Sequence, residues 1–196
     1  MKLSKLINLF SVLCLIILCG ACGANNTVPL KYPEANPGVL PKPGAAHVVV
    51  VIFDDQRTQK NLGKRSDNTE FLGTTSVPEW ISRTLGEELR NKGLQVSFAY
   101  SLSEARRENN KYVITGVLQE ASLKEISIAE LRANLRVDIA MYNPHGKSVL
   151  TEGLSASQSE TGIISTSTAT HLLKSTANEL LAPAVKKINL IVPVAK

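Results

Sequence analysis

The chain has 196 residues, of which 43% are hydrophobic and 20% charged. This composition is typical of a globular protein and excludes a fibrous or wholly disordered chain. The formal net charge of +5 falls to +3 without Lys2 and Lys5, which lie in a segment that we expect to be removed. Acidic and basic residues are interspersed after residue 50. The concentrated basic stripe of a nucleic-acid-binding protein is missing, so we expect no nucleic-acid partner.

The first 21 residues are typical of a secretory signal peptide. The nearly unbroken apolar run Leu6–Leu18 is followed by the small residues Gly20 and Ala21. This run is shorter than the ~20 apolar residues that a membrane-spanning helix needs. Gly20 and Ala21 directly before Cys22 resemble the lipobox of bacterial lipoproteins, which are cleaved before a lipidated cysteine. An aliphatic residue is usual where this chain has Cys19, and an ordinary signal peptide cleaved nearby is the alternative.

The lipobox resemblance implies that Cys22 carries a diacylglycerol and the new amino terminus a further acyl chain such as palmitate. Two or more chains anchor a protein stably. All three cysteines fall within the first 22 residues, so the body can form neither a disulfide nor a thiolate metal site. Gly23 stands where enterobacterial lipoproteins retained in the inner membrane tend to have Asp. The resemblance therefore implies attachment to the outer membrane, facing the periplasm.

Residues 22–46 are predicted to be the lipidated cysteine and a proline-rich tether. Proline fixes φ and lacks a backbone donor, so the segment favours an extended, semi-rigid chain. At about 3.1 Å per residue it would hold the domain up to roughly 75 Å from the lipid. The alternative is that part of it packs on the domain and shortens this reach. The prolines are Pro29, Pro33, Pro37, Pro41 and Pro43.

Residues 47–196 are predicted to form a single domain. The β-branched run His47–Phe53 indicates a buried strand. The polar stretch Asp54–Thr75 indicates a long loop, with a short strand around Phe71. A helix is expected from Pro78 to Lys92, where Gly93 ends it. Its apolar residues recur every four positions, at Ile81, Leu85 and Leu89.

Four further strands are expected. Two are Leu94–Ala99 and Lys111–Gln119. The segment Leu131–Tyr142 has apolar residues at every odd position, with Arg132, Asn134, Arg136 and Asp138 between them, which is typical of a strand with one buried face. The turn Asn143–Gly146 then leads to the partner strand Ser148–Gln158.

The last element is predicted to be a helix of roughly fifteen to twenty residues that starts near Thr168. Pro183 is expected to kink or restart it, because proline cannot donate the backbone hydrogen bond. The order β-α-β-β-β-β-α predicts an α+β fold. It is a two-layer sandwich, with a mixed β-sheet and two helices on one of its faces.

The candidate binding residues are Asp54, Asp55, Arg57 and Trp80. The first three follow the end of a strand, where α/β proteins often place ligand groups, and paired carboxylates could bind a cation or share a proton. The alternative is that Arg57 pairs with one aspartate while the other caps the loop, since successive strand residues point to opposite faces. Trp80 is either an exposed anchor for a partner or part of the core.

No catalytic constellation is recognisable. The three histidines, His47, His145 and His171, lack the spacing of zinc ligands. The body contains neither a Gly-x-Ser-x-Gly elbow nor a phosphate-binding loop of the Gly-x-x-x-x-Gly-Lys type. We therefore expect no catalytic residues, no metal site and no cofactor.

The segment Val48–Asn68, with Asp55-Gln56-Arg57-Thr58 after a strand, resembles the YajG-type family of bacterial lipoproteins. The likeness extends to the lipobox, to the helix that ends at Lys92-Gly93-Leu94, to the strand at Asp138-Ile139 and to the C-terminal helix. It covers most of the mature chain. The resemblance implies an outer-membrane lipoprotein with a small α+β domain, and it implies no enzymatic activity.

The leading hypothesis is a non-catalytic binding or assembly module of the cell envelope. Its partner would be another envelope protein, a glycan or a lipid, and the strand at 148–158 could add a partner strand at its edge. The first alternative is an accessory lipoprotein of an envelope transport, lipopolysaccharide-assembly or flagellar machine, which rests on analogy alone. The second is an envelope hydrolase that uses Asp54 or Asp55.

Overall fold

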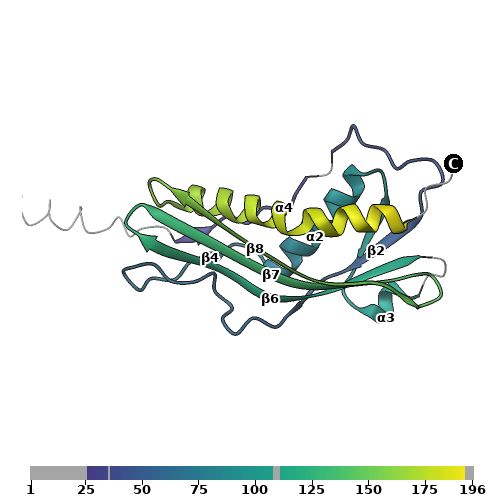
Figure 1. Ribbon diagram of the computed structural model, residues 1–196, viewed down its shortest axis with the longest axis horizontal. Helices are drawn as coiled ribbons and strands as arrows, with labels where there is room; N and C mark the ends of the chain where they lie inside the picture. Colours follow the sequence, from purple (N-terminus) through teal and green to yellow (C-terminus); the bar gives the residue numbers. More distant parts are fainter. Residues whose placement is uncertain (1–25, 35, 108–110, 193–196) are drawn as a thin grey trace, which may run out of the picture.

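A computed structural model describes residues 26–34, 36–107 and 111–192. The predicted signal peptide and Cys22 lie outside the described residues. The main sheet has the strand order β5-β2-β6-β7-β8 (Figure 1). β2 (His47–Val51) is parallel to both β5 (Gln95–Ala99) and β6 (Tyr112–Ser127). β7 (Glu130–Tyr142) and β8 (Ser148–Thr161) continue the sheet as antiparallel strands, so the sheet is mixed, as predicted.

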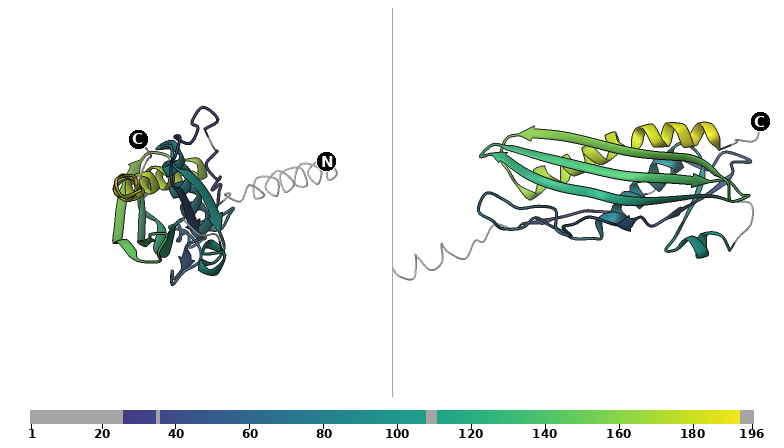
Figure 2. Two further views of the ribbon diagram at one scale, coloured as in Figure 1. Left: turned by 90° about the vertical axis from the view of Figure 1, so that its right-hand side faces the viewer. Right: turned by 60° about the horizontal axis from the view of Figure 1, so that its bottom comes forward.

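Two helices cover one face of this sheet. α2 (Val77–Asn91) packs against β5 and β2, and α4 (Thr166–Ile191) lies along β7 and β8 (Figure 2). The short helix α3 (Leu102–Ala105) covers part of the opposite face, where Ala105 packs with Val49, Val51, Ala99 and Val113. The predicted α+β sandwich, with its order β-α-β-β-β-β-α, is confirmed. α3 and two of the three two-residue strands were not predicted, and the third, β4 (Leu72–Gly73), lies next to Phe71, where a short strand was expected.

The three strands β6, β7 and β8 form a long antiparallel ribbon. In β7 the side chains alternate between the core and the outer face, because successive strand residues point to opposite sides. β6 is longer than the predicted Lys111–Gln119 and runs on to Ser127. A shift in pairing between Leu118 and Glu120 marks a bulge, after which the buried residues fall on odd positions. Because the alternation of buried and outward residues changes phase at the bulge, the second half of β6 does not continue the pattern of the first half. The sequence pattern alone therefore did not predict it.

α4 spans 26 residues and begins at Thr166, where the Ser165 hydroxyl accepts a hydrogen bond from the Thr168 N–H at 3.1 Å. The helix continues through Pro183, so the predicted restart does not occur. Residues on both sides of the proline, including Leu181 and Ala184, are fully buried, and this packing holds the helix across the missing hydrogen bond. No helix in the described ranges is both long and apolar enough to cross a membrane.

The first described residues of the predicted tether, from Asn26 on, fold into the domain. β1 (Thr27–Val28) pairs in parallel with β4 (Leu72–Gly73), at the place of the strand expected around Phe71. Val28 and Leu30 are buried in the main core. Further along, the Lys42 N–H donates to the Gly93 carbonyl at 2.9 Å. The packed alternative therefore describes this segment, and the roughly 75 Å reach expected of a fully extended tether does not apply.

Candidate functional site

Asp55 and Arg57 form a bidentate ion pair shortly after the end of β2. Here β3 (Asp54–Asp55) lies beside β6. Arg57 Nε and Nη2 donate to the two carboxylate oxygens of Asp55 at 2.9 and 3.0 Å, and the Arg57 side chain is only 5% exposed. Partial burial raises the pKa of the Asp55 carboxyl, but the hydrogen bonds and charge of Arg57 outweigh it, so this pKa lies below its ordinary value. Asp55 is therefore ionised at neutral pH.

The two aspartates do not share a site. Asp54 is exposed and accepts a hydrogen bond from the Gln56 amide at 3.1 Å. Arg57 also donates to the carbonyls of Lys60 and Asn61, at 3.3 and 3.4 Å. The Arg57 guanidinium thus crosslinks the loop. Its pairing with one of the two aspartates agrees with the structural alternative for these residues. Trp80 is only 4% exposed and belongs to the core, so it cannot serve as an exposed anchor in this conformation.

The loop that follows Arg57 is docked on β6. Leu62 is fully buried, and its carbonyl accepts a hydrogen bond from the Leu123 N–H. Gly63 has φ +117°, and a Cβ at this position would lie 2.1 Å from the Leu123 carbonyl oxygen. Only glycine allows this close approach. The contact fixes the loop at the margin of the outer sheet face, the face opposite α2 and α4.

An open hollow of about 310 Å³ lies beside this contact, lined by the loop on one side and by β6 and β7 on the other. Its loop side includes Arg57 and Asn61, and its strand side includes Glu120, Ser122 and Arg136. Amide, hydroxyl and charged groups dominate this lining, whereas small-molecule sites are mostly apolar. Arg136 is exposed and makes no ion pair with any described residue. The hollow offers hydrogen bonds to a hydroxylated or anionic group.

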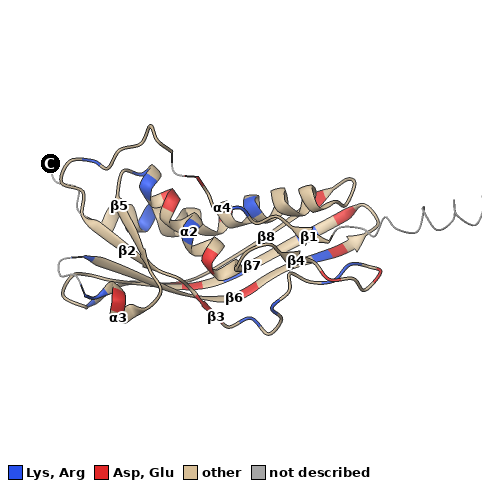
Figure 3. Cartoon of the chain, turned by 180° about the vertical axis from the view of Figure 1, so that it is seen from behind, with Lys and Arg blue, Asp and Glu red and all other residues tan. Residues whose placement is uncertain are grey.

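A row of polar side chains extends from the hollow across the outer sheet face. The Ser157 hydroxyl donates to Asn134 Oδ1 at 2.8 Å, and the Asn134 amide donates to the Ser122 hydroxyl at 3.3 Å. Nearby, Arg132 Nε donates to the Ser159 hydroxyl at 3.0 Å. Basic and acidic residues alternate along the molecule without a single-sign stripe (Figure 3). Ser122, Asn134 and Arg136 were not predicted as site residues. Their even positions in the alternating strands place them on the outer face, and this pattern could have indicated them.

β8 is the outer edge of the main sheet and pairs only with β7 among the described strands. The Gly162 N–H donates to the Ala129 carbonyl at 2.8 Å, and these residues continue the β7–β8 register. Antiparallel pairs alternate in their hydrogen bonding, so even-numbered β8 residues bond to β7 and odd-numbered residues direct their N–H and C=O groups to the free edge. The residues that face the free edge are Thr151, Gly153, Ser155, Ser157, Ser159 and Thr161.

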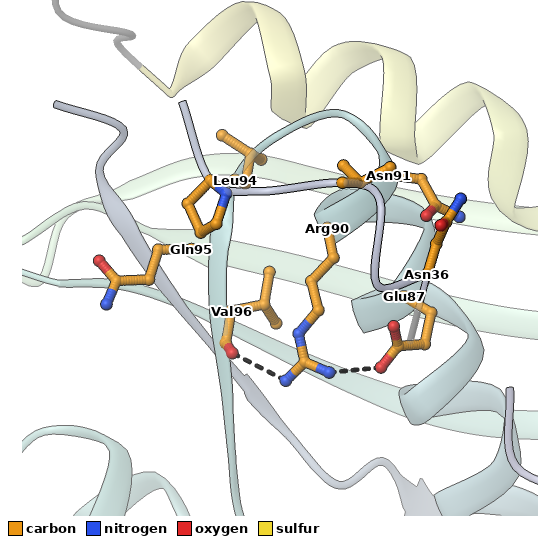
Figure 4. A pocket seen from close by; sticks show the side chains of 9 residues that line it. Asn36, Glu87, Arg90, Asn91, Leu94, Gln95 and Val96 are labelled. Carbon is orange, nitrogen blue, oxygen red and sulfur yellow. Dashed lines mark hydrogen bonds and ion pairs between the residues drawn. The ribbon is translucent and has the colours of Figure 1, made fainter. Parts of the chain in front are cut away.

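A second, smaller hollow of about 140 Å³ lies between the proline-rich segment, α2 and β5 (Figure 4). Arg90 lies across it, paired with Glu87 and donating to the Val96 carbonyl at 2.9 Å. The Glu87 side chain is 9% exposed, and its Oε2 atom has no hydrogen-bond partner among the described residues. Asn36, Val39 and Pro41 of the proline-rich segment also line it. None of these residues was predicted as a candidate.

No family model matches the chain, and no curated protein matches its sequence. A Xanthomonas campestris protein of the DUF330 family model aligns with a TM-score of 0.60 at 6% identity, over 84% of this chain and 94% of that chain. An uncharacterized protein aligns with a TM-score of 0.57 at 9% identity, over 83% and 97%. A minor lipoprotein from Acinetobacter baumannii aligns with a TM-score of 0.45 at 13% identity, over 77% and 98%. The first two share the fold of this chain.

Proposed function

We propose that this protein is a YajG-type lipoprotein, held on the outer membrane by lipid on Cys22 and facing the periplasm, where it serves as a non-catalytic binding or assembly module. The lipobox-like sequence before Cys22 supports the anchor. The single observation that supports the assembly role is the free edge of β8, a 14-residue strand. A free edge offers a row of unpaired N–H and C=O groups to another strand.

The sequence of β8 lacks the usual protection of an exposed edge. Edge strands are commonly guarded by proline or lysine, and Ser148–Thr161 contains neither. Its charged residues, Glu152 and Glu160, point to the helix side, where they contact Lys187 and His171 of α4. The outer side of the edge is therefore uncharged and rich in hydroxyl groups, which suits an added strand from another envelope protein.

A hydrolase that uses Asp55 is less favoured. Both Asp55 carboxylate oxygens accept hydrogen bonds from Arg57, and the Lys60 ammonium lies 3.3 Å from Oδ1. A nucleophile or general base needs a free oxygen directed at its substrate. The Asp55–Arg57 pair supports a structural role for this loop, beside a hollow that could accept a polar group of the partner.

The test is photo-crosslinking in intact cells, with the crosslinker at Ser159 on the free edge and at Lys186 on α4 as the control site. We expect a single dominant protein adduct from Ser159 and none from Lys186. Ser155→Pro removes an N–H that faces the free edge without removing a bond to β7, so it should abolish this adduct. The matched variant Ser155→Ala keeps the N–H and should retain it.

Two results would contradict the proposal. An adduct that survives Ser155→Pro would show that the partner does not bind by strand addition. The absence of any protein adduct from Ser159, in a chain that remains folded and membrane-bound, would exclude a protein at this edge. Mass analysis of the amino-terminal peptide tests the anchor separately, because an unmodified cysteine would exclude the lipoprotein assignment.

A further inference from the structure

Three exposed isoleucines lie at the same end of the long ribbon. Ile128 occupies the turn between β6 and β7 and is 99% exposed, and Ile126 just before it is 40% exposed. Ile163 follows β8 and is 88% exposed. The hydrogen bond from the Gly162 N–H to the Ala129 carbonyl joins the two turns. We call Ile126, Ile128 and Ile163 the isoleucine tip.

The first described residue of the chain is fastened beside this tip. Arg65 donates from Nη1 to Asn26 Oδ1 at 3.0 Å and from Nε to Glu125 Oε1 at 2.9 Å. Glu125 directly precedes Ile126 in β6. β1, which begins at Thr27, lies toward the same end of the elongated molecule as the β6–β7 turn (Figures 1 and 3). The chain therefore enters the fold at the end that carries the isoleucine tip.

The distance from the predicted anchor to this end is short. Cys22 precedes Asn26 by four residues. A fully extended chain spans at most ~3.6 Å per residue, so Asn26 lies within about 14 Å of Cys22. The acyl chains on Cys22 would enter the bilayer directly, and the end of the domain that contains Asn26 must then stay close to the lipid surface.

We propose that the isoleucine tip inserts into the surface of the same bilayer that holds the anchor, so that the domain stands on the membrane. This inference rests on the lipid anchor of the proposed function. Exposed apolar side chains beside an acyl anchor bury their surface in the headgroup region and add to the attachment. The ribbon then points away from the membrane, and the β7–β8 turn around His145 lies at its far end.

Charge and size both favour lipid over a protein at the tip. Two acidic side chains at the adjacent strand ends are ion-paired, Glu125 with Arg65 and Glu130 with Arg132. This pairing limits their repulsion of anionic headgroups. A stable protein interface buries about 800 Å² on each partner, and three isoleucine side chains fall short of that area.

The test uses the processed full chain, purified with its lipid and reconstituted in phosphatidylethanolamine–phosphatidylglycerol vesicles. The body contains no cysteine after Cys22, whose thiol the lipid blocks, so a single introduced cysteine can be labelled selectively. An environment-sensitive fluorophore is attached at Ala129→Cys in the tip and, as the control, at His145→Cys in the opposite turn. Vesicles with and without nitroxide-labelled lipid report whether each fluorophore contacts the bilayer.

We expect a blue-shifted emission at Ala129→Cys that nitroxide lipid quenches, and an unshifted, unquenched emission at His145→Cys. Adding Ile128→Ser and Ile163→Ser should return the emission at position 129 toward that at position 145. Leu190→Ser, at an apolar position on α4 that is 77% exposed, should leave it unchanged. Equal emission at positions 129 and 145 would overturn the inference.

The acylation state of Cys22 distinguishes a failure of the insertion inference from a failure of the proposed function. Cys22 that carries lipid in the same preparation, together with an unquenched tip, would overturn membrane insertion and leave the anchored module intact. Unmodified Cys22 would overturn the anchor, and the insertion inference would fall with it.

Discussion

Arg65 and Glu125, 60 residues apart in the sequence, form an ion pair with 2.9 Å between Nε and Oε1. Glu125 is 7% exposed at its side chain and also accepts a hydrogen bond from the Ser66 N–H at 2.9 Å. Arg65 in turn bonds to Asn26. This pair therefore connects the amino-terminal segment, the loop before β4 and the end of β6 near the isoleucine tip.

Replacing Glu125 by Ala should destabilise the protein by about 1–3 kcal/mol, because it leaves Arg65 and the Ser66 N–H without their acceptor. Urea unfolding in detergent, followed by the fluorescence of the single and buried Trp80, measures this change. The control is Glu34→Ala, since Glu34 is exposed. A free energy of unfolding that is unchanged in Glu125→Ala would show that the pair does not hold the segment.

Stability should fall in acid because of Asp55 and Glu125. Burial raises the pKa of each carboxyl, but hydrogen bonds and charge from Arg57, and from Ser66 and Arg65, lower it further than burial raises it. Groups with a lowered folded pKa contribute stability that is complete above the ordinary values of 3.8 and 4.5 and is lost as the pH falls through the lower folded values.

The free energy of unfolding should therefore decrease between about pH 5 and about pH 2. Asp55→Asn should lose stability at neutral pH and show a shallower decrease in acid. Urea unfolding at several pH values measures both effects. A parallel pH dependence in the variant and the parent chain would mean that Asp55 does not contribute to the acid response.

Gly63→Ala should destabilise more than Gly146→Ala. Both glycines have positive φ, at +117° and +76°. A Cβ at Gly146 meets nothing within 4 Å, whereas a Cβ at Gly63 meets the Leu123 carbonyl. Gly146→Ala thus measures a backbone cost without a clash, about 1–2 kcal/mol, and the excess in Gly63→Ala measures the steric clash together with the greater backbone strain at φ +117°. Equal losses in thermal unfolding would argue against the close approach of the loop to β6.

Pro183→Ala should stabilise α4. Pro183 is exposed, so the substitution removes little packing, and it restores an N–H that can bond to the Glu179 carbonyl. Proline inside a helix costs about 3 kcal/mol relative to alanine, so we expect a gain of about 1–3 kcal/mol in urea unfolding. Lys186→Ala, at another exposed position of α4, is the control. A loss of stability in Pro183→Ala would show that α4 needs the geometry imposed by proline.

The sequence by itself determined the order of the main elements and the fold class. Leu131–Tyr142 could be assigned as a strand because its residues alternate with the period of a pleated strand, and Met141 and Leu131 are indeed buried. The helix at Val77–Asn91 followed from apolar residues at four-residue spacing. These are local patterns, and local periodicity is what a single sequence expresses.

The tertiary structure decided the features that depend on residues far apart in the chain. β1 consists of Thr27 and Val28 and exists because β4 supplies a partner 45 residues away, so the proline-rich segment alone could not indicate it. The free edge of β8 follows from the strand order of the sheet. The isoleucine tip requires two turns and the entering chain to meet at one end, and only long-range hydrogen bonds such as those of Arg65 place them there.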